Sequence, residues 1–172
     1  DDLISSRISP ENERVYFGIS KMDSDLDECI NIVNDMRVCP KCYSPLKYNY
    51  LRYHHIGNAY CPKCGFASPK ADYCADVDFN SLTLKMNAKG EITEFPLVND
   101  SIFNAYNLTA VIALLVEFGI APDKLIPTLS HQKIVETRFS NEKIGSVEVI
   151  SNMAKGQNPI ACSCVFDYVK KA

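Results

Sequence analysis

The sequence has no apolar run of the length that a membrane-spanning helix needs. Its longest run, Ala110 to Val116, is far shorter than the roughly 20 residues that cross a hydrocarbon core. A run of this length fits a buried helix instead. We therefore expect a protein that is not an integral membrane protein.

The chain also lacks the excess of positive charge that nucleic-acid binding requires. Its 18 Lys and Arg residues are outnumbered by 21 Asp and Glu residues, which gives a formal net charge of -3 over 172 residues. A domain that binds DNA or RNA normally carries a clear basic footprint. No nucleic-acid partner is expected.

No signal peptide opens the sequence, although the chain contains 8 cysteines. Cysteines in a chain without such a signal indicate a reducing compartment rather than a secreted disulfide scaffold. A cytoplasmic location follows as an expectation. The first residue is Asp1 rather than a methionine, which indicates that something upstream has been removed.

Two familiar catalytic signatures are absent as well. The sequence contains no G-x-x-x-x-G-K-[ST] phosphate loop and no convincing Ser/His/Asp or Cys/His constellation. His131 stands alone, and Cys162-Ser163-Cys164 is typical of small residues in a buried helix. No catalytic residue can be named from these patterns.

What the sequence does contain is a pair of C-x-x-C knuckles separated by eighteen residues, which is the spacing of a zinc ribbon. Proline stiffens each turn, and Gly65 can take the positive φ that lets backbone N–H groups approach a thiolate. Four thiolates about 2.3 Å from one ion make a closed tetrahedral site without room for water. We predict a structural Zn²⁺ with these ligands: Cys39, Cys42, Cys61 and Cys64. Iron in a rubredoxin-like site is the alternative, because soft thiolates suit both metals.

The residues between the knuckles are typical of a β-hairpin, with Tyr48 and Tyr50 on its faces and Gly57-Asn58 marking the turn. Basic residues interleaved with tyrosines fit a nucleic-acid surface, as in many zinc ribbons, or a small hairpin that the lysines solvate. The acidic chain favours the second interpretation. His54 and His55 are interpreted as surface residues, because four cysteines already fill a tetrahedral site.

The rest of the chain predicts an α/β fold with a mostly parallel sheet, helices and one antiparallel hairpin. The ribbon, residues 36–75, is expected as an insert in a core made of residues 1–35 and 76–172. The nearly continuous apolar run over 14–19 is typical of a strand buried on both faces. The helix over 102–118 is apolar on nearly every side, so we expect it at the centre of the core. The other expected elements are a helix over 23–35, hairpin strands over 79–86 and 91–97, a helix over 123–129, a strand over 146–150 and a last helix from near residue 159.

Four polar residues are candidates for contact with a ligand. Asn104 and Asn107 lie three apart on one face of an apolar helix, where their amides need partners. Helix-terminal hydrogen bonds and contact with a purine are both open. Arg138 lies in a polar loop and Lys155 follows a strand, where open α/β sheets bind phosphates, although either alone is more often a surface charge.

These residues occur in the order seen in the central domain of Mur ligases. The matching stretches are Phe103-Asn104-Ala105-Tyr106-Asn107-Leu108-Thr109-Ala110, Thr137-Arg138-Phe139 and Ala154-Lys155, and Asp1-Asp2 resembles the end of that family's Asn-x-Asp-Asp element. A four-cysteine ribbon inserted between the buried strand and the hairpin is similar to the MurT-like branch of the family. The resemblance covers nearly the whole chain.

The resemblance implies a ligase of peptidoglycan synthesis that uses ATP and Mg²⁺ to activate the D-glutamate carboxylate of lipid II. Ammonia from a GatD-type glutamine amidotransferase would then give D-isoglutamine. It also implies that Asn107 contacts adenine with support from Asn104, that Arg138 lies near ribose and phosphates, and that Lys155 reaches phosphate. The family's tighter Ala-Lys-Asn-Pro stretch differs from Lys155-Gly156-Gln157-Asn158-Pro159, which has two more residues.

By the same resemblance, the phosphate loop and magnesium ligands would precede Asp1, and the acceptor domain would follow Ala172. The 172 residues alone are therefore expected to have no ligase activity. Two alternatives remain at this point. One is a non-enzymatic zinc-ribbon module that binds protein or nucleic acid, and the other is a Mur-like ligase with a different acceptor.

Overall fold

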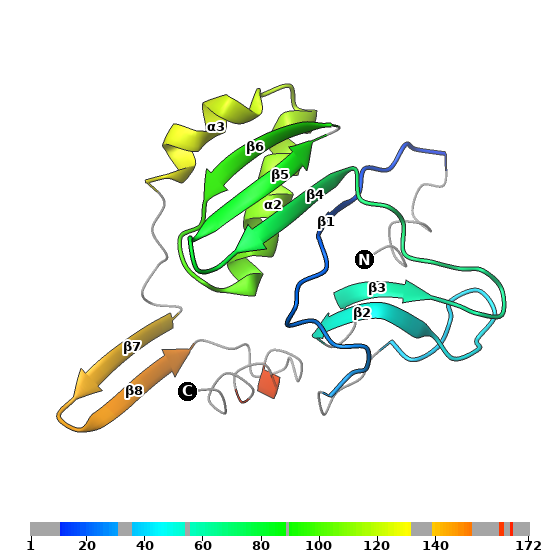
Figure 1. The fold of residues 1–172 in the computed structure, drawn as a ribbon, viewed down its shortest axis with the longest axis horizontal. Coiled ribbons are helices and arrows are strands. Elements are labelled where there is room, and N and C mark those ends of the chain that lie inside the picture. The colour runs from blue at the N-terminus through cyan, green and yellow to red at the C-terminus, as the bar shows by residue number, and fades with distance from the viewer. Residues whose placement is uncertain are drawn as a thin grey trace. The chain divides into compact units, whose positions relative to one another are not determined.

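The computed structural model describes residues 11–30, 36–53, 56–88, 90–131, 139–152, 162, 163 and 166. The chain divides into two compact units. Figure 1 labels the helices and strands of each unit. The core unit comprises residues 1–22 and 69–133, and the ribbon unit comprises residues 23–68 and 134–172. The Asp1-Asp2 element, Arg138, Lys155 and the start of the expected helix near residue 159 lie outside the described residues.

The core unit is built on a four-stranded sheet with the order β1-β4-β5-β6. β1 (Phe17–Ile19) runs parallel to β4 (Tyr73–Asp78). β5 (Thr83–Ala88) is antiparallel both to β4 and to β6 (Glu91–Pro96). The predicted antiparallel hairpin is confirmed, and the sheet in the described residues is mixed rather than mostly parallel.

The sequence analysis does not predict β4, although this strand lies between β1 and β5. Tyr73 and Ala75 are buried on its inner face, whereas Asp76 and Asp78 are exposed on the other. Acidic residues are depleted in strands, so they conceal the alternating pattern. The Tyr73 hydroxyl donates a 2.6 Å hydrogen bond to Glu117 Oε1, which ties the strand to the helix above it.

The expected burial of the first strand on both faces is wrong in the described structure. Ile19 is buried, but Val15 and Phe17 are exposed. β1 lies at the edge of the described sheet and has one neighbour, β4. An apolar run therefore indicated a strand with a parallel neighbour, but it did not indicate how fully its side chains are covered.

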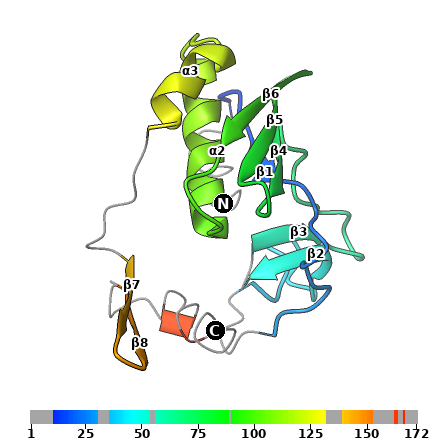
Figure 2. The ribbon, with the colours of Figure 1, turned by 60° about the vertical axis from the view of Figure 1, so that its left-hand side comes forward.

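Two helices pack on the core sheet. α2 (Ile102–Glu117) runs along one face of the sheet (Figure 2), and α3 (Pro122–Leu129) contributes Leu125 and Leu129 to the same hydrophobic core. Gly119, with φ of +85°, follows the end of α2 as predicted, because this left-handed conformation suits glycine. The largest fully buried side chains of this core are Tyr73, Leu84, Met86, Phe95 and Ile112.

α2 is not central in the core, contrary to the prediction. Ala105, Thr109, Ile112 and Ala113 face inward and are buried. The opposite side is exposed although it is apolar, and it includes Phe103, Val111 and Leu114. Uniform apolarity thus failed to predict full burial, because α2 covers one face of the sheet with one side only. Among the described residues, no helix is long and apolar enough to cross a membrane.

The ribbon unit contains two hairpins. β2 (Lys47–Tyr53) pairs with β3 (Ile56–Tyr60), and β7 (Phe139–Ile144) pairs with β8 (Val147–Asn152), both antiparallel. β8 overlaps the strand predicted over 146–150 at residues 147–150, whereas β7 was not predicted. Gly145, with φ of +65°, lies in the turn between β7 and β8.

The helix predicted over 23–35 is absent over 23–30, the part that the structure describes. Leu26 instead forms an antiparallel bridge with Leu51 of β2, with N···O distances of 2.8 and 2.6 Å in the two directions. Asp25 accepts two hydrogen bonds from the Arg52 guanidinium at 2.8 and 2.7 Å. These long-range contacts override a weak helical pattern, because they satisfy backbone groups and bury a charge at once.

The predicted turn at Gly57-Asn58 is also wrong, because both residues lie within β3. Gly57 pairs with Leu51, and Asn58 pairs with Tyr50. A Cβ built on Gly57 would lie 2.3 Å from the Tyr50 carbonyl oxygen and 2.9 Å from the Leu51 Cα. Glycine is required here by the close approach of two backbones and not by a turn.

We expect Gly57→Ala to destabilise the ribbon unit by at least about 2 kcal/mol, because the backbone of β2 cannot move aside without breaking the pairing. Gly18→Ala is the matched control. Gly18 lies in β1, and a Cβ added there would be an ordinary 3.7 Å from the Cβ of Ala71. Amide hydrogen exchange in β2 and β3 measures the effect. Equal protection in the two variants would contradict the proposed steric role of Gly57.

Candidate metal centre

The structure brings the four predicted cysteines together. The Sγ atoms of Cys39 and Cys64 are 3.5 Å apart, and those of Cys42 and Cys61 are 3.6 Å apart. All four sulfurs lie within 4.8 Å of one another, and all four cysteines are free thiols. A tetrahedron with metal–sulfur bonds of about 2.3 Å has sulfur–sulfur edges of about 3.8 Å. The four sulfurs are therefore close enough together to bind a single metal ion.

The two knuckles share one backbone pattern. In the first, the Cys39 N–H donates to the Ser44 carbonyl at 2.8 Å, and the Tyr43 N–H donates to the Cys39 carbonyl at 2.9 Å. In the second, the corresponding bonds join Cys61 with Phe66 and Gly65 with Cys61, at 2.6 and 3.1 Å. Each knuckle is thus a closed turn that fixes the direction of its first cysteine.

This shared turn requires a left-handed residue at the same place in each knuckle. Gly65 has φ of +72°, as the sequence indicated, and Tyr43 has φ of +58°. A tyrosine in this region costs roughly 1 kcal/mol or more, because its Cβ crowds the following carbonyl oxygen. The first knuckle therefore keeps a strained tyrosine where the second has an unstrained glycine.

Burial divides the four ligands into two classes. Cys39 and Cys61, the first cysteine of each knuckle, are 0% and 2% exposed, whereas Cys64 is exposed and Cys42 is intermediate. The Lys41 N–H also points at the Cys39 sulfur, with a nitrogen–sulfur distance of 3.4 Å. A bound ion would therefore have two ligands on the buried side, Cys39 and Cys61, and two on the solvent side, Cys42 and Cys64.

The electrostatics of the cluster favour a cation at its centre. The backbone and hydroxyl of Ser44 donate hydrogen bonds that lower the pKa of Cys42 from 9.0 to about 6. At Cys64, a backbone hydrogen bond from Phe66 lowers the pKa, but partial desolvation of the sulfur and hydrogen bonds with the three neighbouring cysteines outweigh it and raise the pKa to about 12. Once one thiolate has formed, its charge opposes the next. A metal cation removes that opposition and allows all four thiols to ionise.

The described part of the ribbon unit has a small apolar core. Its buried apolar residues are Cys39, Leu51, Ala59 and Cys61, so half of them are candidate metal ligands. Domains of this size normally need a staple such as a metal. A four-sulfur site leaves no open position for a substrate, so a metal bound here would serve structure and not catalysis.

The structure places two of the four candidate nucleotide residues, and both lie on α2. Asn104 donates from Nδ2 to Asn99 Oδ1 at 3.0 Å, and the same oxygen accepts the Ser101 N–H at 3.2 Å. Asn107 is exposed one turn further along the helix. Asn104 is thus engaged at the helix start, while Asn107 faces the surface. Asn99-Asp100-Ser101 is also the stretch that the sequence predicts as the cap of this helix, and an asparagine just before a helix often makes such local bonds.

Known proteins resemble this chain in sequence and in fold. No family model matches it. The lipid II isoglutaminyl synthase (glutamine-hydrolyzing) subunits MurT of Staphylococcus aureus strains COL and N315 are each 31% identical to it over 121 residues, which cover 70% of this chain and 26% of theirs. A pseudomurein peptide ligase type C from Methanothermus fervidus is 26% identical with a TM-score of 0.71, covering 88% of this chain and 30% of that one. The chain spans about a quarter of the length of the curated relatives it matches.

Proposed function

Because the chain resembles MurT in sequence and a pseudomurein peptide ligase in fold, as its motifs predicted, we propose that it is part of an ATP-dependent ligase of the Mur type. The observation that carries this proposal is the TM-score of 0.71 over 88% of the chain to a solved peptide ligase. A match of that extent includes more than a single small motif. It disfavours the alternative of an isolated zinc-ribbon binding module.

The proposed reaction is the amidation of the D-glutamate α-carboxylate of lipid II in the cytoplasm. The carboxylate would attack the γ-phosphorus of ATP, which releases ADP and leaves an acyl phosphate. Ammonia would then attack the acyl carbon, lose a proton and expel phosphate, which converts the D-glutamate residue to D-isoglutamine. MurT is named as one subunit of a glutamine-hydrolyzing synthase, and this supports a GatD-type glutamine amidotransferase as the partner that supplies ammonia. Mg²⁺ would neutralise the charge on the transferring phosphoryl group.

The part of this reaction that falls to the described residues is the positioning of adenine. Asn107 is exposed on α2, so its amide can offer a donor and an acceptor to a purine edge. Asn104 is bonded to Asn99 and would hold the start of α2 in place rather than touch the base. Arg138 and Lys155 are proposed to contact ribose and phosphates, as the family resemblance implies.

For the metal centre we propose Zn²⁺, with iron as the alternative. Four thiolates satisfy the preferred tetrahedral geometry of Zn²⁺, and the sulfur spacing of 3.5 to 3.6 Å fits its bond length. Bound there, the ion would supply a cross-link between the two knuckles. The residues that hold it are the four named cysteines, all from the ribbon unit.

Asn107→Ala should raise the KM for ATP about tenfold with little change in kcat, because roughly 1.4 kcal/mol of hydrogen bonding to the base is lost in ground and transition states alike. Steady-state kinetics on the longest reading frame that contains this chain would measure the change. Thr128→Ala, at an exposed position of α3, is the matched control and should leave the KM unchanged. If the KM for ATP is identical in both variants, Asn107 does not contact adenine.

The ligase activity itself is tested with the same protein, lipid II, ATP, Mg²⁺, glutamine and the amidotransferase subunit. Mass spectrometry should find one amide per lipid II, dependent on ATP, and ammonium should replace glutamine and the partner. ATP-dependent amidation of another acceptor in place of lipid II would favour a different Mur-like ligase. An intact protein that neither binds nor hydrolyses ATP would favour the non-enzymatic module.

A further inference from the structure

The part of the ribbon unit that contains the two knuckles is positively charged, whereas the chain as a whole is negatively charged. Residues 36–68 contain five Lys and Arg residues and no Asp or Glu, whereas the whole chain has a net charge of -3. Arg52 is paired with Asp25 at 2.7 Å. The other four basic residues are exposed: Arg37, Lys41, Lys47 and Lys63.

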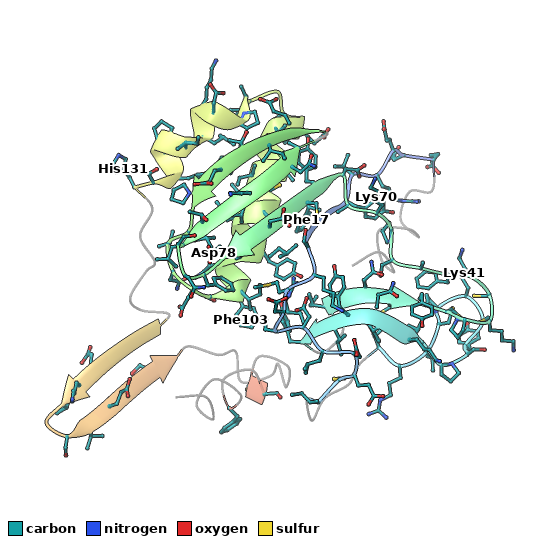
Figure 3. The ribbon with its side chains drawn as sticks, in the orientation of Figure 1. Phe17, Lys41, Lys70, Asp78, Phe103 and His131 are labelled. Carbon is teal, nitrogen blue, oxygen red and sulfur yellow. The ribbon has the colours of Figure 1, made fainter. Side chains whose placement is uncertain are left out.

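Three of these four cations gather around the knuckles. Arg37 precedes the Val38–Pro45 bridge and accepts the Leu46 N–H at 2.9 Å through its carbonyl, which fixes it beside the first knuckle. The Lys41 ammonium lies 5.8 Å from the centroid of the Phe66 ring and so reaches across to the second knuckle. Lys63 adjoins Cys64. Figure 3 labels Lys41 at the knuckle end of the ribbon.

Apolar side chains share this end of the ribbon with the cations. Val38 is 51% exposed and Tyr43 is 77% exposed. Tyr43 is also the residue that occupies the left-handed position that glycine fills in the other knuckle. Because the ring of Tyr43 makes so little contact within the protein, its side chain does not offset the cost of the strained backbone. Backbone strain of this kind is concentrated at functional sites, and it points to an external partner for the tyrosine ring.

We propose that this knuckle surface, consisting of Arg37, Val38, Lys41, Tyr43 and Lys63, docks the protein onto a bilayer that contains anionic lipids. Lysine and arginine bind the anionic head groups, a tyrosine ring lies at the head-group level, and an aliphatic side chain enters the acyl boundary. A nucleic acid would use the cations and the ring but would leave the exposed valine without a role. This inference rests on the proposed function in one respect: a ligase whose substrate is linked to a lipid works at a membrane.

The test is co-sedimentation of the 172-residue protein with vesicles at low ionic strength. We expect binding to vesicles of equal parts phosphatidylglycerol and phosphatidylcholine, and no binding to phosphatidylcholine alone. Salt at about 0.5 M should release the protein, because it screens the attraction between exposed charges. Lys41→Gln and Lys63→Gln should each lower the partition coefficient about fivefold, which corresponds to about 1 kcal/mol per basic residue. Lys124→Gln, on exposed α3, is the control and should have no effect.

Tyr43→Gly separates docking from stability. It removes the backbone strain, so the ribbon should keep its metal and its hydrogen-exchange protection while vesicle binding falls severalfold. Equal binding to neutral vesicles, or equal losses in the Lys41, Lys63 and Lys124 variants, would overturn the proposal. Salt-sensitive binding to single-stranded RNA with no vesicle binding would replace it with a nucleic-acid surface. Ligase assays in detergent are independent of docking, so the two proposals can fail separately.

Discussion

Cys61→Ser is expected to remove nearly all bound metal, from about one equivalent per chain to below about a tenth. Cys61 is 2% exposed, and its sulfur lies 3.6 Å from that of Cys42. A serine hydroxyl is a poor zinc ligand, and the remaining three thiolates leave the tetrahedron open. Structural zinc contributes about 10–16 kcal/mol of apparent binding free energy to small domains, which far exceeds what the few buried residues of the ribbon supply.

The same substitution should unfold the ribbon unit and leave the core unit folded. Amides of β2 and β3 should lose their protection from hydrogen exchange, while those of β4, β5 and β6 should keep it, because the core has its own buried residues. Cys74→Ser is the matched control, since the Cys74 sulfur lies in the core unit, 3.1 Å from the Ser20 hydroxyl. Stoichiometric metal in purified Cys61→Ser protein would contradict this account of the ribbon.

Arg52→Ala is expected to destabilise the ribbon unit by about 3–5 kcal/mol. The guanidinium binds both oxygens of Asp25 at 2.8 and 2.7 Å, and the two side chains are 6% and 0% exposed. Removal of Arg52 leaves a buried carboxylate without its counter-ion, and this penalty dominates the effect. Replacement of the exposed pair Lys85–Glu94, which is 3.7 Å apart and more than half exposed on both sides, should change stability by less than about 0.5 kcal/mol.

A double variant distinguishes the cost of an unpaired charge from a loss of packing. Arg52→Met with Asp25→Leu removes both charges and fills the space with apolar atoms, so it should recover most of the lost stability. Urea unfolding followed by hydrogen exchange in β2 and β3 would report the ribbon unit alone. A double variant as unstable as Arg52→Ala would show that the stability comes from the shape of the ion pair and not from the paired charges.

Local chemistry explains which features the sequence predicted. Two C-x-x-C knuckles carry their chemistry in four adjacent residues each, so their spacing alone identified the cysteines that the structure brings together. The hairpin before α2 and the glycine after it were likewise predicted from short patterns. Tyr43 was missed because its left-handed φ depends on the turn that the first knuckle closes and not on the residue type.

Long-range pairing explains most of the errors. The segment that contains Asp25 and Leu26 has a helical pattern, but its partners Leu51 and Arg52 lie about 25 residues further along the chain. Gly57 has the composition of a turn and is instead required where β2 approaches β3. Neither contact is encoded within one window of sequence. The burial of α2 was overestimated for a related reason, since apolarity does not indicate how many neighbours cover a helix.

X-ray absorption on the purified 172-residue protein tests the metal centre most directly. We predict a zinc edge with four sulfur neighbours at about 2.3 Å and no nitrogen or oxygen neighbour in the first shell. An iron edge with the same four sulfurs would change the metal but keep the site. A first shell with nitrogen or oxygen, or protein with less than about half an equivalent of either metal, would contradict the four-cysteine centre on which this account depends.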